Sequence, residues 1–231
     1  ATSAHQGCRP GAAPQVAARA WDIPMVELCD GIFVEKGMPE GLQRWIVGMH
    51  TRALDRVGNF FGGLKAEKPE VVLCSTDDCR RYFAGRADNA RSSYRGSPGE
   101  RGTVFITTID ASFEGVLAHE MSHAELHARI APHVVPAWFN EGLATYVSRS
   151  PSCEYAPLAQ LEDIRALADN EAWRNGTDAT TQESWAIYCR ARTEVERWYL
   201  HHGSAHFLAL LEGVKRGESF DDLYGPLVTQ D

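Results

Sequence analysis

Apolar residues recur at helical spacing over 40–60, beginning after Pro39 and ending before Gly62-Gly63. Residues three and four positions apart share one face of an α-helix, so this pattern predicts a helix with one buried face. Proline at the start and glycine after the end are typical helix boundaries. The residues of the apolar face are Leu42, Trp45, Ile46, Met49, Ala53, Leu54, Val57 and Phe60.

Strand-like patterns occur on both sides of this helix. The clearest is Thr103–Ile109, which is β-branched or aromatic at every position and is followed by Asp110. Other patterns in this half predict extended chain at 21–34 with a turn at 29–31, a strand at 71–73, a helix from 76 or 77 to about 83, and a polar loop at 88–102.

The second half of the chain carries mainly helical periodicity. Prolines and glycines divide it, and the helices are expected at about 112–130, 137–149, 157–169, 184–202, 204–213 and 219–224. This distribution predicts an α+β fold, with a mixed sheet lobe at about 21–110 stacked on a mainly helical lobe at about 111–231. Residues 1–20 have no period and are expected to form a leader or flexible arm outside this single domain.

Charge and hydropathy exclude two classes of partner. The net charge is −8, and no lysine- or arginine-rich run interrupts the mixture of signs, so nucleic acid is not an expected ligand. No apolar stretch approaches the roughly 20 residues that span a bilayer, and the first residues lack the layout of a signal peptide.

The six cysteines indicate a possible oxidising environment. Cys74 and Cys79 bracket a short polar segment and are the best candidates for a disulfide, which favours a periplasmic or secreted protein. The alternative is six buried free thiols in a cytoplasmic protein. The remaining cysteines are Cys8, Cys29, Cys153 and Cys189.

The strongest chemical signal is His119-Glu120-Met121-Ser122-His123 on the predicted helix 112–130. Histidines four residues apart project from one helix face and can share a metal ion. A catalytic zinc site takes three protein ligands and leaves a fourth position for water. Glu120 can then act as the base that removes a proton from that water.

Two positions are candidates for the third ligand. A third histidine six residues after His123 would fall at Arg129, which excludes that arrangement. After the prolines at 132 and 136, however, a second helix begins, and Asn140-Glu141-Gly142-Leu143-Ala144 lies in its first turns. Together the two segments resemble the gluzincin branch of the zincin metallopeptidases, in which such a glutamate completes the metal site.

This resemblance implies a zincin-like fold, with the active-site helix between the two lobes, and a ligand set of His119, His123 and Glu141. It also implies that an edge strand, here expected at Thr103–Ile109, binds the substrate backbone. A tyrosine or histidine should stabilise the oxyanion. Tyr188 is the first candidate for that role, with Tyr199, His202 and His206 as alternatives.

The sequence departs from the family at two points. Position 145, where some members carry an acid that supports a ligand histidine, is Thr145, and no Gly-x-Met-Glu-Asn exopeptidase motif is present. His127 continues the metal-binding face by one turn and is expected to be a partly buried polar residue.

These features predict a zinc endopeptidase that hydrolyses peptides or proteins, with one Zn²⁺ per chain, a zinc-activated water and Glu120 as general base. Two other functions stay open. The first is a catalytically inactive binding protein on a zincin scaffold, and the second is a zinc amidase that acts on cell-wall peptide.

Overall fold

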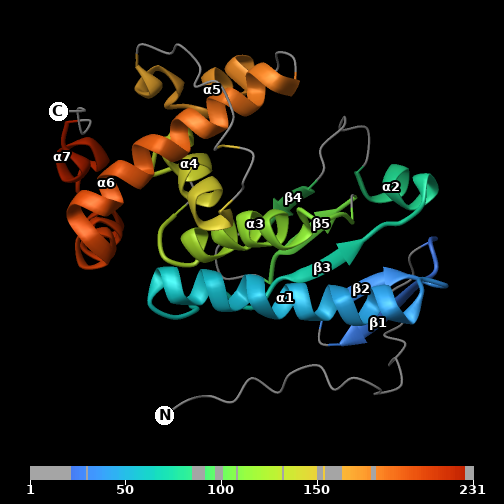
Figure 1. Cartoon of the computed structure of the whole chain (residues 1–231). Helices are drawn as coiled ribbons and strands as arrows, with labels where there is room; N and C mark the ends of the chain where they lie inside the picture. The colour runs from blue at the N-terminus through green and yellow to red at the C-terminus, as the bar shows by residue number, and fades with distance from the viewer. Residues whose placement is uncertain are drawn as a thin grey trace.

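The computed structural model of the protein describes residues 22–29, 31–84, 92–96, 101–107, 109–131, 133–149, 153, 163–177 and 181–226. The predicted arm at 1–20 lies outside these residues. The architecture is α+β, as the sequence predicts: a small mixed sheet lies on one side and most of the helices on the other, with α3 between them (Figure 1).

The sheet has five strands in the order β1-β2-β3-β5-β4. The parallel pairs are β2 with β3 and β3 with β5, whereas β1 and β4 lie antiparallel at the two edges. The strands are β1 (Met25–Cys29), β2 (Ile32–Glu35), β3 (Glu70–Leu73), β4 (Ser92–Arg95) and β5 (Thr103–Ile106).

The expectation that Thr103–Ile109 is an edge strand is wrong. The strand within it, β5, is paired on both sides, and the edge beside it is β4, which falls within the segment expected to be a polar loop. The sequence Ser-Ser-Tyr-Arg of β4 is too short and too polar to show a strand period. It is a strand because its backbone pairs with β5.

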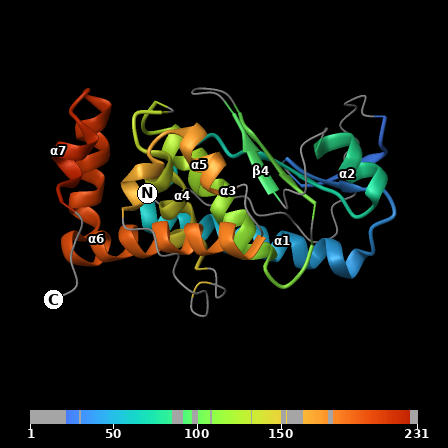
Figure 2. The ribbon, with the colours of Figure 1, turned by 90° about the horizontal axis from the view of Figure 1, so that it is seen from above.

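Helices cover the sheet and form the second lobe, as Figure 2 shows from above. Ile46 of α1 and Leu117 of α3 are fully buried and belong to the same core as Ile32, Val71 and Val104 of the sheet. The helices are α1 (Glu40–Phe61), α2 (Asp77–Ala84), α3 (Phe113–His127), α4 (Ala137–Ser148), α5 (Asn170–Thr177), α6 (Thr181–Lys215) and α7 (Phe220–Tyr224).

Most predicted helices are present, with two differences. The helix expected at 157–169 is a single 3-10 turn, η2 (Ile164–Leu167), in its described part, and α5 was not predicted. The predicted break at Gly203 is confirmed, because this residue has non-helical angles (φ 79°, ψ 174°) within α6. Glycine adopts such a conformation without the steric cost of a side chain.

Helices α4 and α6 approach each other closely at Gly142. A Cβ atom on this residue would lie 2.6 Å from the backbone oxygen of Ala191. Glycine at this position therefore lets α6 lie directly against α4. This contact brings Tyr188 of α6 to the side of the molecule where Glu141 of α4 is located.

Among the described residues, Cys74–Cys79 and Cys153–Cys189 form disulfides. The first is the predicted pair, and the alternative of free thiols is wrong for the described cysteines, because none of them is free. Disulfides are typical of oxidising compartments. Within the described part of the chain, no helix has both the length and the apolar character needed to cross a bilayer.

Candidate metal centre

Helix α3 brings the two histidines of the motif together. They are four residues apart, which is close to one helical turn, and His119 Nε2 lies 3.2 Å from His123 Nε2. Both side chains are mostly buried, with 17% and 11% of their surface exposed. The two ring nitrogens therefore face one shared position at the surface of α3.

Helix α4 supplies the third group. The chain turns after α3, and Pro136 immediately precedes α4, so that Glu141 lies in its second turn. Its Oε2 atom is 3.3 Å from His119 Nε2 and 3.6 Å from His123 Nε2. The structure thus brings together the three residues that were proposed from the sequence as metal ligands.

These three donors form the one group of at least three histidine, cysteine or acidic side chains in the described part of the chain that could hold a metal ion. Their ligand atoms lie within 4.8 Å of one another. Tetrahedral coordination at the usual bond lengths of about 2.0–2.1 Å places ligand atoms about 3.3–3.4 Å apart. The observed separations therefore suit one tetrahedral ion that keeps a fourth position open.

Asn140 fixes the orientation of His123. Its Oδ1 atom lies 2.9 Å from His123 Nδ1, where it accepts the ring proton. In the neutral form of the ring, the form that can bind a metal ion, this hydrogen bond leaves the lone pair on Nε2, the atom that faces Glu141. Asn140 lies within the sequence motif, but the motif alone does not indicate this hydrogen bond. Thr145, by contrast, donates to the backbone oxygen of Glu141 and does not support a ligand histidine.

The charges of the cluster favour a cation at its centre. Burial disfavours the charged form of His123, but the Glu141 carboxylate outweighs this effect and raises the pKa of His123 to about 9. Burial would likewise raise the pKa of Glu141, but the positive charge on His123 outweighs it and holds that pKa well below its usual range. Positive charge is thus stabilised at the point where the three donors meet.

Glu120 lies beside the cluster and is only 6% exposed. Its carboxylate oxygen Oε1 accepts a hydrogen bond of 2.6 Å from the Ser92 hydroxyl. Ser92 belongs to β4, so this bond connects the edge of the sheet to α3. Sequence reasoning missed Ser92, because it lies 28 residues before Glu120 in a segment that was expected to be a loop.

Tyr188 reaches the cluster from α6. Its ring centre is 6.4 Å from that of His119, and the rings of Trp173 and Trp185 pack against it. Burial raises the pKa of Tyr188 well above its usual value, so the hydroxyl keeps its proton and can donate it in a hydrogen bond.

The three alternatives to Tyr188 are not brought to the cluster. Tyr199 lies 11 residues after Tyr188 in α6, which corresponds to about 16 Å along the helix. Its ring stacks on Phe60. His202 and His206 lie on either side of the Gly203 break, with their ring centres 5.5 Å apart.

His127 and Glu125 do not belong to the metal centre. The His127 ring lies 6.5 Å from that of His123 and packs against Tyr94, and burial lowers the pKa of His127 to about 4. Glu125 is 1% exposed and accepts hydrogen bonds from the backbone of Lys65 and Ala66. Glu125 therefore anchors the loop after α1, and no fourth protein ligand joins the cluster within the described residues.

A pocket of about 560 Å³ is lined by His127 and Asn140, with apolar surface from Ile130, Val135 and Phe220. None of His119, His123 and Glu141 lines it, and Asn140 is its one described residue with a hydrogen bond to the cluster.

No protein-family model matches the chain, and no curated protein matches it either. A function for this protein is therefore inferred from the chemistry of the cluster itself.

Proposed function

We propose that this protein is a zinc-dependent peptidase of the gluzincin type, most simply an endopeptidase. The observation that carries the proposal is the meeting of His119, His123 and Glu141 from two helices, with Glu120 beside them. In this arrangement the position that a fourth ligand would take is left to water, as in catalytic rather than structural zinc sites.

The donor set favours zinc over other common metal ions. Two imidazole nitrogens and one carboxylate oxygen suit Zn²⁺, whereas Ca²⁺ and Mg²⁺ prefer six or more oxygen ligands. The 3.2–3.6 Å separations between the donor atoms also agree with tetrahedral geometry. His119, His123 and Glu141 would hold one zinc ion per chain.

When bound, the zinc would act as a Lewis acid toward a water molecule and the substrate carbonyl. Glu120 takes a proton from this water as its oxygen forms a bond to the carbonyl carbon. Glu120 then gives the proton to the amide nitrogen while the carbon–nitrogen bond breaks. The products are a carboxylic acid and an amine; the acid proton then passes to the amine, which gives a carboxylate and an ammonium group, and Glu120 is again ionised.

Tyr188 is the proposed oxyanion stabiliser. Its hydroxyl stays protonated because of burial, and the two tryptophans around its ring restrict its movement. A donor held in advance at the oxygen where negative charge develops lowers the barrier more than a mobile one.

Strand β4 is the proposed binding site for the substrate backbone, in place of the strand expected from the sequence. It is an edge strand of the described sheet, and Ser92 and Tyr94 contact Glu120 and His127 of α3. An extended peptide could therefore pair with β4 while it passes over the metal centre. The two disulfides support a periplasmic or secreted location, where protein and peptide substrates are both available.

The test is a peptide-library digestion with wild-type protein and the Glu120→Gln variant, each with and without a chelator. We expect wild-type cleavage that the chelator abolishes. The variant should keep about one zinc per chain and lose cleavage by a factor of about 10² or more. Full activity of Glu120→Gln would refute the mechanism. Zinc binding without cleavage of peptides or cell-wall peptide would favour the binding-protein alternative, and cleavage of cell-wall peptide alone would favour the amidase.

A further inference from the structure

The carboxylate of Glu120 is held from outside its own helix. Ser92 Oγ donates a 2.6 Å hydrogen bond to Glu120 Oε1, and Ser92 is the first residue of β4. The other oxygen, Oε2, accepts no hydrogen bond from the residues that the structure describes. The two oxygens of the base therefore have different surroundings.

This difference matters for proton transfer. A buried glutamate has three side-chain torsions, and a single strong hydrogen bond to one oxygen removes most of its alternatives. With Oε1 occupied by Ser92, the carboxylate can present Oε2 to a water molecule. Efficient proton transfer requires donor and acceptor atoms at hydrogen-bond distance and in a fixed orientation.

We propose that Ser92 is a positioning residue that aligns Glu120 for proton transfer from the attacking water. This inference rests on the proposed peptidase function and adds to it. Ser92 belongs to the strand that would pair with the substrate backbone. The same strand would therefore fix the positions of both the Glu120 carboxylate and the scissile bond. The scissile bond should accordingly lie close to Ser92, at the beginning of β4.

The experiment compares Ser92→Ala, Ser92→Thr and the control Ser204→Ala. Ser204 is exposed on α6 and lies outside the proposed catalytic and substrate-binding residues. The control therefore removes the same atom without removing the bond to Glu120. Each variant is assayed for zinc content, thermal unfolding, kcat and KM on the peptide that the wild type cleaves fastest.

We expect Ser92→Ala to lower kcat by about tenfold to a hundredfold and to change KM by less than about twofold, with zinc content unchanged. Ser92→Thr keeps the hydroxyl and should restore kcat to within about threefold of the wild type. Ser204→Ala should behave as the wild type. A role that is only structural would instead lower the unfolding temperature and would not separate kcat from KM.

The inference is overturned if Ser92→Ala keeps wild-type kcat, or if threonine fails to restore what alanine loses. It is also overturned if Ser204→Ala is equally impaired. A wild-type protein that binds zinc but cleaves no peptide would instead refute the proposed function and, with it, the role of Glu120 that Ser92 is proposed to support.

Discussion

At the scale of single residues, each reactive group has a neighbour that restricts it. Asn140 orients His123, Ser92 holds Glu120, and the rings of Trp173 and Trp185 pack against Tyr188. Such partners cost little when they are formed with the fold, and in the proposed reaction they would spare the site from reorganising. The arrangement is therefore more specific than three metal ligands alone would be.

Removing the partner of His123 should weaken metal binding. In Asn140→Ala the Nδ1 proton loses its acceptor, so the ring can rotate or change tautomer, and zinc affinity should fall about 10- to 100-fold. Competition against a chelator of known affinity measures this change. Asn140→Asp keeps an acceptor oxygen and serves as the control. Equal zinc affinity in the alanine variant and the wild type would show that Asn140 does not orient the ligand.

The residues of the centre differ in how far the sequence could predict them. His119 and His123 follow from helix periodicity, and Glu141 follows from a motif on the next helix, because both signals are local. The hydrogen bonds of Asn140 and Ser92 depend on contacts across 17 and 28 residues, and no local pattern encodes them. Tyr188 was one candidate among four, and the packing of α6 on α4 distinguishes it from the others.

At the scale of elements, the contact between α4 and α6 determines whether Tyr188 reaches the cluster. We expect Gly142→Ala to destabilise the protein by about 1–3 kcal/mol, because the new methyl group would collide with the backbone of Ala191. Displacement of α6 should also lower peptidase activity. Thermal or denaturant unfolding measures the stability change.

Gly41→Ala is the control for this substitution. Gly41 also lies in a helix, but a Cβ atom there meets nothing within 4 Å. Alanine should therefore stabilise the protein by about 0.5–1 kcal/mol, by reducing the entropy of the unfolded chain. If both variants changed the free energy of unfolding in the same direction, the close contact at Gly142 would be contradicted.

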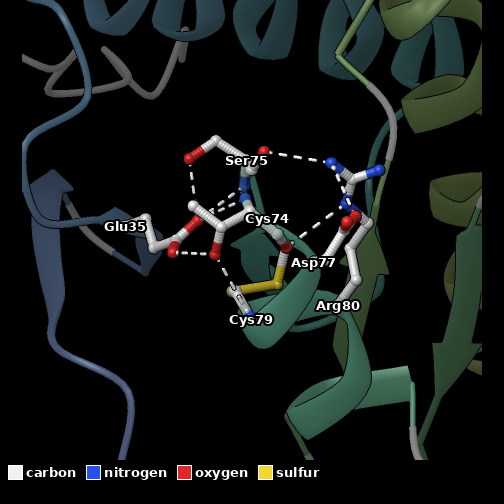
Figure 3. Close-up of a disulfide and its surroundings, with 7 residues drawn as sticks. Glu35, Cys74, Ser75, Asp77, Cys79 and Arg80 are labelled. Carbon is white, nitrogen blue, oxygen red and sulfur yellow. Dashed lines mark hydrogen bonds and ion pairs between the residues drawn. A yellow bond between two sulfur atoms is a disulfide. The ribbon is translucent and has the colours of Figure 1, made fainter.

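Glu35 connects β2 to the segment after β3, as Figure 3 shows around the Cys74–Cys79 disulfide. Its carboxylate accepts hydrogen bonds from the backbone and hydroxyl groups of Ser75 and Thr76. Burial alone would raise the pKa of Glu35, but the hydrogen bonds from Thr76 and Ser75 outweigh it, and the pKa lies below its usual value. The folded state thus prefers the ionised form.

The sign of the resulting pH dependence follows from this lowered pKa. The stabilisation from Glu35 is fully present above the unfolded-state pKa of about 4.3 and is lost as pH falls through the lower folded-state pKa. Glu35→Gln should therefore cost about 1 kcal/mol at pH 7, a modest value because solvent screens the group, and progressively less below pH 4. Urea unfolding at pH 7 and below pH 4 measures this loss of stability, with exposed Glu67→Gln as the control. If Glu35→Gln costs the same stability at both pH values, Glu35 does not have the lowered pKa.

The elements that the sequence predicted correctly are those with a long local period. Helix α1 and helix α3 repeat apolar residues over several turns, whereas β4 has four residues and depends on its neighbour for its structure. The position of Thr103–Ile106 inside the sheet could not be read from its composition, because a buried strand and a half-buried edge strand can both be β-branched.

At the scale of the whole molecule, the two disulfides should differ in their effect on stability. Cys153–Cys189 closes 36 residues and Cys74–Cys79 closes 5, so the longer loop restricts the unfolded chain more. Replacing both cysteines of a pair by alanine should cost roughly 3–4 kcal/mol for Cys153–Cys189 and about 2 kcal/mol for Cys74–Cys79. Denaturant unfolding of the two double variants compares them, and the reverse order would contradict the loop-length argument.

The fold as a whole serves to bring α4 back against α3, so that a carboxylate from one helix meets two imidazoles from the other. The most direct test of this claim is the zinc content of wild-type protein and of Glu141→Ala after equilibration with a competing chelator, with exposed Glu171→Ala as the control. We predict about one zinc per chain in the wild type and in the control. The zinc affinity of Glu141→Ala should fall by more than roughly 100-fold, because a residue that only supports a ligand changes the affinity by at most about that factor. Wild-type protein that binds no zinc, or equal binding by Glu141→Ala, would contradict the account.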